Sequence, residues 1–173
     1  TTFVALLRAV NVGGTGKLAM ADLKAICEAA GCRSVRTYIA SGNVVFDSAR
    51  GEKAVQSLLH KGLLAHAGKP VDVIVRSAAE MSEVLARNPF AERPPRETVA
   101  IFLNAPPPPS ALDDVTGKAK EELRLGTREI YVHYGPSMGT SKLRIPAARR
   151  GTARNMNTVA TLAAMAGEAS PKK

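Results

Sequence analysis

The 173-residue sequence contains no tryptophan, and its aromatic residues together make up only 4%. An RNA-recognition motif stacks bases on aromatic side chains of its two central strands. The corresponding apolar runs here offer only Phe3, at a strand end, and Phe46. The scarcity of aromatics therefore argues against sequence-specific RNA reading of this kind, but leaves open contact between the C-terminal arginines and a nucleic-acid backbone.

Cysteine and histidine are also scarce, with two and three residues. Cys27 and Cys32 form no CxxC motif and have no histidine pair nearby, so a structural role is favoured over a zinc site or a redox role. His60 and His66 lie six positions apart on one predicted helix and point to different sides. No GxSxG motif or Ser-His-Asp order is present. We therefore predict no metal and no cofactor.

Long hydrophobic runs are missing as well. None approaches the roughly 20 residues of a membrane span, and the N-terminus lacks the basic, apolar and small-residue succession of a signal peptide. The hydrophobic fraction of 45% is nevertheless enough for a core in a chain of this length. We expect a cytoplasmic protein with no membrane partner.

The stretch "NVGGTGKLAM" at residues 11–20 resembles a phosphate-binding loop. A Walker motif requires Gly, four residues, then Gly-Lys-Ser/Thr. Asn11 stands where the first glycine belongs, and Leu18 stands where the hydroxyl belongs. The motif therefore fails at two positions.

Basic residues are in excess, with 24 Lys and Arg against 15 Asp and Glu, for a formal charge of +9. From residue 140 onward, seven basic side chains accompany a single acid, Glu168. Such a patch attracts phosphorylated ligands or polyanions, although a solvated face with a basic tail at residues 168–173 explains it equally well.

Apolar periodicity predicts the order βαββαβ for residues 1–76. The strands are expected at residues 3–9, 34–40, 44–47 and 71–75, and the helices at about 19–30 and 55–68. Two right-handed crossovers around a central hairpin then produce a ferredoxin-like half, with both helices on one face of the sheet.

The remainder of the chain repeats this order in part. Ser77 and Glu80 form a capping box that starts a helix, and residues 77–97 are that helix and a proline-containing connection. Residues 98–167 are predicted to run βαββα, with a short helix from Ser110 and a last helix at about 155–166. We predict an α+β protein of two ferredoxin-like halves in one compact unit, the second lacking its last strand.

Titratable side chains in the second half are predicted to be solvated. The acidic pairs at 113–114 and 121–122 stand among polar residues. His133 alternates with Ile130 and Val132, which favours an exposed histidine on the sheet surface. These groups are therefore not predicted to act as paired acids and bases.

Three polar clusters are candidate ligand-binding sites, because they follow the ends of predicted strands and helices. They are Arg8, Asn11, Gly13 and Gly14; Ser41 and Asn43; and Ser141, Lys142, Arg154, Asn155, Asn157 and Thr158. Arginine beside a helix N-terminus favours an anion. Each cluster also has a purely structural reading: a glycine turn, a left-handed asparagine, and an Asn155 N-cap.

The stretches "ALLRAVNVGG", "SVRTYIASGNVVF" and "SKLRIPAARRGTARNMNTVATLAAMA" resemble the bacterial domain of unknown function 1697 family. The resemblance extends from Phe3 to Ala166. It implies a small bacterial protein of the duplicated kind predicted above, and it implies no established activity, substrate or cofactor.

Three functional hypotheses follow. The first is a binding module for a phosphorylated or anionic ligand, nucleic acid included, at the three clusters. The second is an enzyme that acts on a phosphorylated small molecule. The third is a protein-interaction module that docks through a sheet face.

Overall fold

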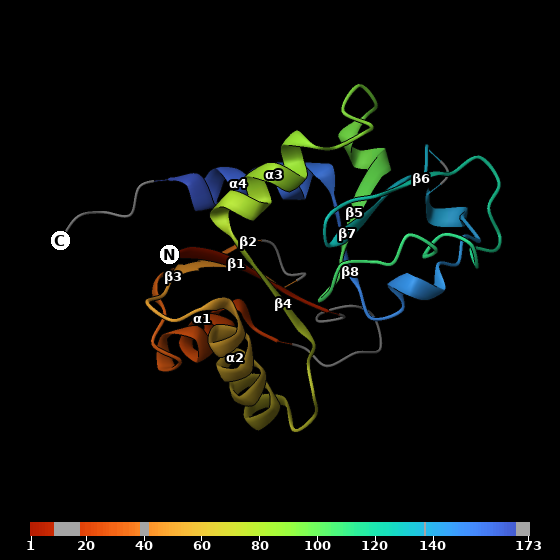
Figure 1. Ribbon diagram of the computed structural model, residues 1–173. Helices are drawn as coiled ribbons and strands as arrows, with labels where there is room; N and C mark the ends of the chain where they lie inside the picture. The colour runs from red at the N-terminus through yellow and green to blue at the C-terminus, as the bar shows by residue number, and fades with distance from the viewer. Residues whose placement is uncertain (9–17, 39–41, 137, 169–173) are drawn as a thin grey trace. The chain divides into compact units, whose positions relative to one another are not determined.

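The computed structural model describes residues 1–8, 18–38, 42–136 and 138–168. The chain forms two compact units, one of Thr1–Ser82 with Leu162–Lys173 and one of Glu83–Thr161. Each unit contains a four-stranded antiparallel sheet (Figure 1). The predicted α+β class is therefore confirmed.

The first unit has the predicted element order. Its strands pair in the order β2-β3-β1-β4. The elements are β1 (Thr2–Leu7), α1 (Met20–Ala29), β2 (Arg33–Tyr38), β3 (Asn43–Asp47), α2 (Glu52–Ala67) and β4 (Val73–Ser77).

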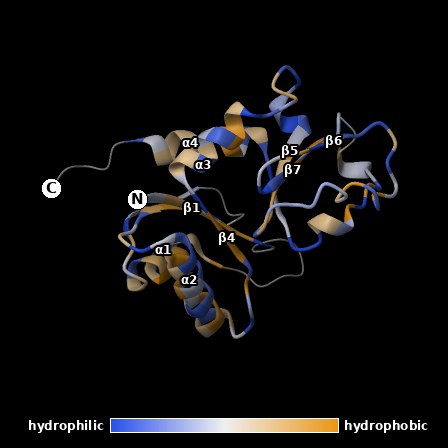
Figure 2. Ribbon diagram, viewed as in Figure 1, coloured by the Kyte–Doolittle hydropathy of each residue, from blue (hydrophilic) through white to orange (hydrophobic). Residues whose placement is uncertain are grey.

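Alternation along the strands determines which side chains enter the core of this unit. Phe3, Ala5 and Leu7 of β1 share one cluster with Leu23 of α1 and Leu59 of α2, because successive strand residues point to opposite faces. Both helices cover this one face of the sheet (Figure 1). Figure 2 shows hydrophobic colour along β4 and a mixture of hydrophobic and hydrophilic residues on α2, as expected for an amphipathic surface helix.

The predicted helix signals are confirmed at two positions. The C-cap of α2 is Gly68, at φ 73°, whose amide donates to the Leu64 carbonyl. At the start of α3 (Ala78–Ala86), the Ser77 amide donates to Glu80 Oε1, and the Glu80 amide donates to Ser77 Oγ. The second arrangement is the reciprocal capping box.

The second unit corrects the prediction that its sheet lacks a final strand. It contains β5 (Thr98–Phe102), β6 (Glu122–Leu125), β7 (Glu129–His133) and β8 (Thr152–Asn155), paired in the order β6-β7-β5-β8. This is the strand order of the first sheet. The sequence "TARN" has no apolar alternation, and β8 exists because its backbone pairs with β5.

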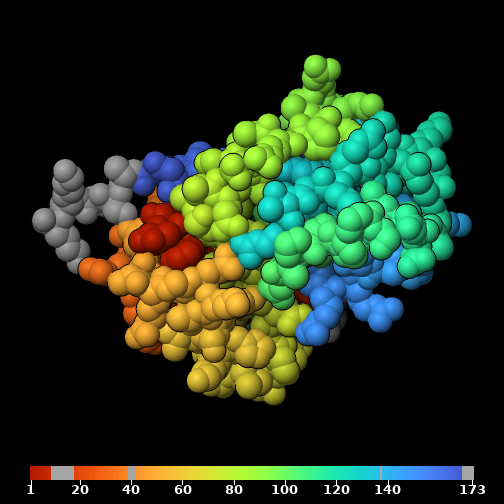
Figure 3. All heavy atoms as spheres, in the orientation of Figure 1, coloured from red at the N-terminus to blue at the C-terminus, as the bar shows by residue number. Residues whose placement is uncertain are grey.

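The predicted short helix from Ser110 is also wrong, because residues 109–114 form turns. Its apolar residues Leu112 and Val115 still pack against the sheet. Figure 3 shows this proline-rich part of the chain, in green, on the surface of the second unit. Turns and two short 3₁₀ helices, Met138–Thr140 and Pro146–Ala148, thus help to cover the face of Val99, Ile101, Ile130 and Val132, where the first sheet uses α-helices.

The last helix, α4 (Met156–Gly167), is anchored at its C-terminal end within the first unit. The Arg36 guanidinium on β2 donates to Glu168 Oε2 at 2.8 Å and to the Met165 carbonyl at 3.0 Å. In the part of the chain that the structure describes, no helix is long and apolar enough to cross a membrane.

Candidate functional site

Arg8 and Asn43, the described members of the first two predicted clusters, lie at one end of the first sheet. Leu6 lies opposite Asn43 in the β1–β3 ladder, and the Leu7 amide donates to the Gly42 carbonyl. Arg8, half-exposed, lies 3.6 Å from the Asp72 carboxylate. The remaining members Asn11, Gly13, Gly14 and Ser41 lie outside the described residues.

Asn43 has a structural role in this hairpin. Its side chain is 0% exposed, and its amide nitrogen donates to the Tyr38 carbonyl at 3.0 Å. This bond joins the end of β2 to the start of β3.

The third predicted cluster is divided between the two faces of the second sheet. Residues 138–148 cover the face of Val99 and Ile101, and Ser141 and Lys142 lie in this segment. Arg154 lies opposite Ala100 in the β5–β8 ladder, so it shares the other face. One small ligand therefore cannot contact both Lys142 and Arg154 within this unit.

The other members of that cluster form the start of α4. Asn155 Oδ1 accepts the Thr158 amide hydrogen at 2.9 Å, which is the N-cap bond. Asn157 is exposed and Thr158 is buried. Burial lowers the pKa of the Arg154 guanidinium to about 10, so this partly desolvated group is still cationic at neutral pH.

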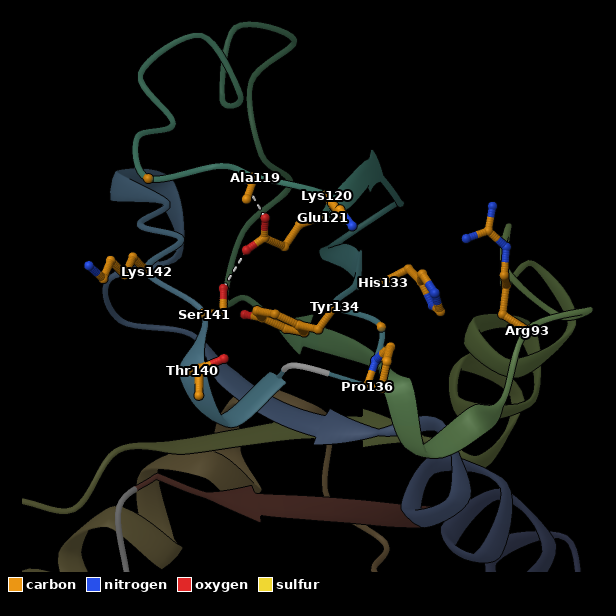
Figure 4. Close-up of a pocket in the computed structure, with 12 residues that line it drawn as sticks. Arg93, Ala119, Lys120, Glu121, His133, Tyr134, Pro136, Thr140, Ser141 and Lys142 are labelled. Atoms are coloured by element: carbon orange, nitrogen blue, oxygen red, sulfur yellow. Dashed lines mark hydrogen bonds between the residues drawn. The ribbon is translucent and has the colours of Figure 1, made fainter.

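A cavity of about 570 Å³ lies within the second unit. Two chain segments and the end of β7 form its walls (Figure 4). The lining residues are Arg93, Gly117, Ala119, Lys120, Glu121, His133, Tyr134, Gly135, Pro136, Thr140, Ser141 and Lys142.

Backbone pairing holds the two wall segments together. Thr116 and Arg144 form an isolated antiparallel bridge, with amide-to-carbonyl distances of 3.0 and 2.8 Å. Gly117 follows at φ 70°, and a Cβ atom there would lie 2.0 Å from the Lys142 carbonyl oxygen. Only glycine allows so close an approach.

Glu121 and Ser141 form a polar pair on the cavity wall. Glu121 Oε1 accepts the Ala119 amide hydrogen at 2.6 Å, and Glu121 Oε2 accepts the Ser141 hydroxyl hydrogen (Figure 4). The Ser141 hydroxyl, followed by the backbone amides of Ala119, Glu121 and Lys120, lowers the pKa of the Glu121 carboxyl. The carboxylate is therefore anionic at neutral pH. Its residue is 5% exposed, which corrects the prediction that it is solvated.

Tyr134 lies beside this pair and adds a hydroxyl to the cavity. Burial and the nearby Glu121 carboxylate raise the pKa of Tyr134, so its hydroxyl keeps its proton. In Figure 4 this hydroxyl points toward the side of Ser141. Among the residues that the structure describes, the Tyr134 hydroxyl has no hydrogen-bond partner. It is therefore available to a ligand.

Three cationic side chains line the cavity, and they differ in their partners. Arg93 forms an ion pair of 2.7 Å with Glu122. Glu122 is the second carboxylate of the acidic pair at 121–122, which the sequence predicted to be solvated. Lys120 and Lys142 are exposed and form no ion pair with any described residue. Figure 4 shows the Lys142 side chain extending away from Glu121 and Ser141, so its ammonium lies at the edge of the set of lining residues.

His133 is buried rather than exposed as predicted. Its side chain is hydrogen-bonded, with Nδ1 2.9 Å from Thr98 Oγ1, and its ring centroid lies 5.7 Å from that of Phe90. The alternation along β7 correctly predicted that His133 lies on the other face of the sheet from Ile130 and Val132. The prediction was wrong because residues outside the strand cover that face.

Residues 1–131 match the family described as "Protein of unknown function (DUF1697)". The chain belongs to the DUF1697 family. The DUF1697 protein is also similar in structure to the conserved bacterial protein SP0830 from Streptococcus pneumoniae, with a TM-score of 0.78 and 22% identity, over 95% of this chain and 98% of that one. At this identity the similarity shows the fold alone. No curated protein matches the chain.

Sequence reasoning identified two lining residues of this DUF1697 protein, Ser141 and Lys142, and missed Glu121, Tyr134 and Lys120. The local sequence around Glu121 is polar, and nothing in it indicates burial. Its burial comes from a segment twenty positions further along the chain, which supplies Ser141. In the part of the chain that the structure describes, no group of three or more potential metal ligands occurs.

Proposed function

We propose that the DUF1697 protein is a binding module for a small anionic ligand, and that the cavity of the second unit is its site. The observation that carries the proposal is the presence of Lys120 and Lys142, two lysines without ion-pair partners among the described residues, on one cavity. Its volume of about 570 Å³ lies in the range of small-molecule sites.

Charge and wall chemistry support an anionic ligand. The formal charge of +9 attracts anions to the protein over long distances. At the wall, lysine ammonium groups donate charge-assisted hydrogen bonds to phosphate or carboxylate oxygens. The Tyr134 ring and Pro136 provide apolar surface for the body of the ligand.

The test is a titration with glycerol 3-phosphate, followed by the amide signals of the protein in NMR spectra at low ionic strength. We expect shifts at residues 119–121 and 141–143, and a loss of about tenfold in affinity for each lysine changed to alanine, which corresponds to about 1.4 kcal/mol. The double variant Lys53→Ala/Lys61→Ala on α2 removes the same charge from exposed positions outside the cavity.

Equal weakening of binding by Lys53→Ala/Lys61→Ala and by Lys120→Ala/Lys142→Ala would show that only net charge matters and would refute the site. Conversion of the phosphorylated probe during the titration would instead support the enzyme hypothesis. Salt-dependent binding of a labelled oligonucleotide that needs Arg154 rather than the two lysines would favour the nucleic-acid hypothesis.

We also propose that both sheets belong to ferredoxin-like halves. The order of elements in the first unit and the common strand order of the two sheets support this. The second half then differs from the first by having turns where a helix would follow β5.

A further inference from the structure

We infer that the ligand of this cavity is zwitterionic, with an ammonium group that binds Glu121 and an anionic group that binds the lysines. This inference rests on the proposed function and specifies its ligand class. The reason is the Glu121 carboxylate on the cavity wall, which a purely anionic ligand would have to approach.

Glu121 is held in place as an acceptor. Its two oxygens accept hydrogen bonds from the Ala119 amide and the Ser141 hydroxyl, one bond each. The backbone amides of Glu121 and Lys120 also lower its pKa, so the described residues surround this carboxylate with neutral hydrogen-bond donors and supply no ion-paired cation. No cationic side chain among the described residues forms an ion pair with it.

The groups around Glu121 do not neutralise it. Ser141 Oγ already donates to the carboxylate and accepts the Leu143 amide hydrogen at 3.2 Å. Arg93 is paired with Glu122. An anion placed against Glu121 would therefore meet an uncompensated like charge in a partly desolvated wall, whereas an ammonium group would gain a charge-assisted hydrogen bond.

The Lys142 ammonium is separated from the Glu121 carboxylate, whereas Lys120, the neighbour of Glu121 in the chain, is drawn beside Glu121 in Figure 4. Glu121, Ser141 and Tyr134 form one wall, and the Lys142 ammonium lies away from them in Figure 4. A ligand with its two charges at opposite ends satisfies both groups. One anionic group alone satisfies only the lysines.

Two phosphate monoesters of similar size test this inference. O-phosphoethanolamine carries an ammonium group where glycerol 3-phosphate carries hydroxyls. We expect wild-type protein to bind O-phosphoethanolamine about tenfold more tightly, in keeping with a charge-assisted hydrogen bond. In Glu121→Gln the two affinities should become equal, and Lys120→Ala/Lys142→Ala should weaken both.

The ratio of the two affinities distinguishes recognition from a structural role. If Glu121 only stabilises the wall, Glu121→Gln lowers the affinity for both ligands by the same factor, and the inference is wrong. Equal, lysine-dependent binding of both by wild type would also overturn the inference and leave the proposed function standing. Binding of neither would overturn both. A Ser82→Ala variant, which changes an exposed residue of α3 outside the cavity, is the control and should keep the wild-type ratio.

Discussion

Gly117 offers a direct test of how the cavity wall is built, because alanine there meets two separate penalties. The residue has φ 70°, and an added Cβ would lie 2.0 Å from the Lys142 carbonyl oxygen. The carbonyl belongs to the backbone, so it can move away only if the 140–144 segment shifts. That shift would stretch the two hydrogen bonds between Thr116 and Arg144.

The two penalties have different sizes. An L-residue with a left-handed backbone costs about 1–2 kcal/mol. Each backbone hydrogen bond contributes a net of about 0.5–1.5 kcal/mol, so loss of both adds about 1–3 kcal/mol. Gly135 is the matched control, since it has φ 76° and nothing within 4 Å of its added Cβ. Gly135→Ala should therefore show only the first penalty.

Urea unfolding followed by tyrosine fluorescence measures the difference. Tyr131 and Tyr134, two of the three tyrosines, lie in the second unit, so their signal reports its unfolding. We expect Gly117→Ala to lower the free energy of unfolding by about 1–3 kcal/mol more than Gly135→Ala, with an unchanged denaturant slope. Equal losses in the two variants would refute the role assigned to the Lys142 contact.

Three further predictions concern single residues. Asn155→Ala removes the N-cap of α4 and should lower the free energy of unfolding by about 1 kcal/mol, whereas Asn157→Ala at an exposed position should change it by less than about 0.5 kcal/mol; equal changes in urea unfolding would contradict the cap. Burial raises the pKa of the Cys27 thiol to about 12, so iodoacetamide should modify it far more slowly in the native than in the denatured protein. A native rate equal to the denatured rate would show that this thiol is accessible. The pKa of Glu121 is lowered from its ordinary 4.5, so its contribution to stability is present above that pH and is lost as the pH falls through the folded-state pKa. The stability difference between wild type and Glu121→Gln should therefore shrink in acid, and a difference independent of pH would argue against this assignment.

The elements of the first unit were predictable because their signals are local. Gly68 ended α2 and the Ser77–Glu80 pair started α3 as their neighbours in the chain indicated. In the second unit the same reasoning failed at β8, whose four residues carry no strand pattern. Their extended conformation depends on pairing with β5, more than forty residues earlier.

The candidate site was less predictable than the fold. Its lysine at 142 was found through the excess of basic residues, but Arg154 proved to face the other side of the sheet from it. Nearness in sequence is a poor guide there, because Lys142 lies in a segment that covers one face of the sheet, whereas Arg154 pairs with Ala100 and so lies on the other face. Glu121 was missed for the reverse reason: its partner Ser141 is distant in sequence and close in space.

Composition and periodicity alone thus specified the α+β class, helices α1 to α4 and most strands, since these depend on side chains a few positions apart, but they also predicted a helix at Ser110 that does not form. The cavity arose only when the segments around Thr116 and Arg144 came together. Their pairing placed a buried carboxylate and two lysines on the walls of one space. Neither segment's sequence predicts that arrangement by itself. It depends on backbone hydrogen bonds between two parts of the chain that meet only in the folded protein.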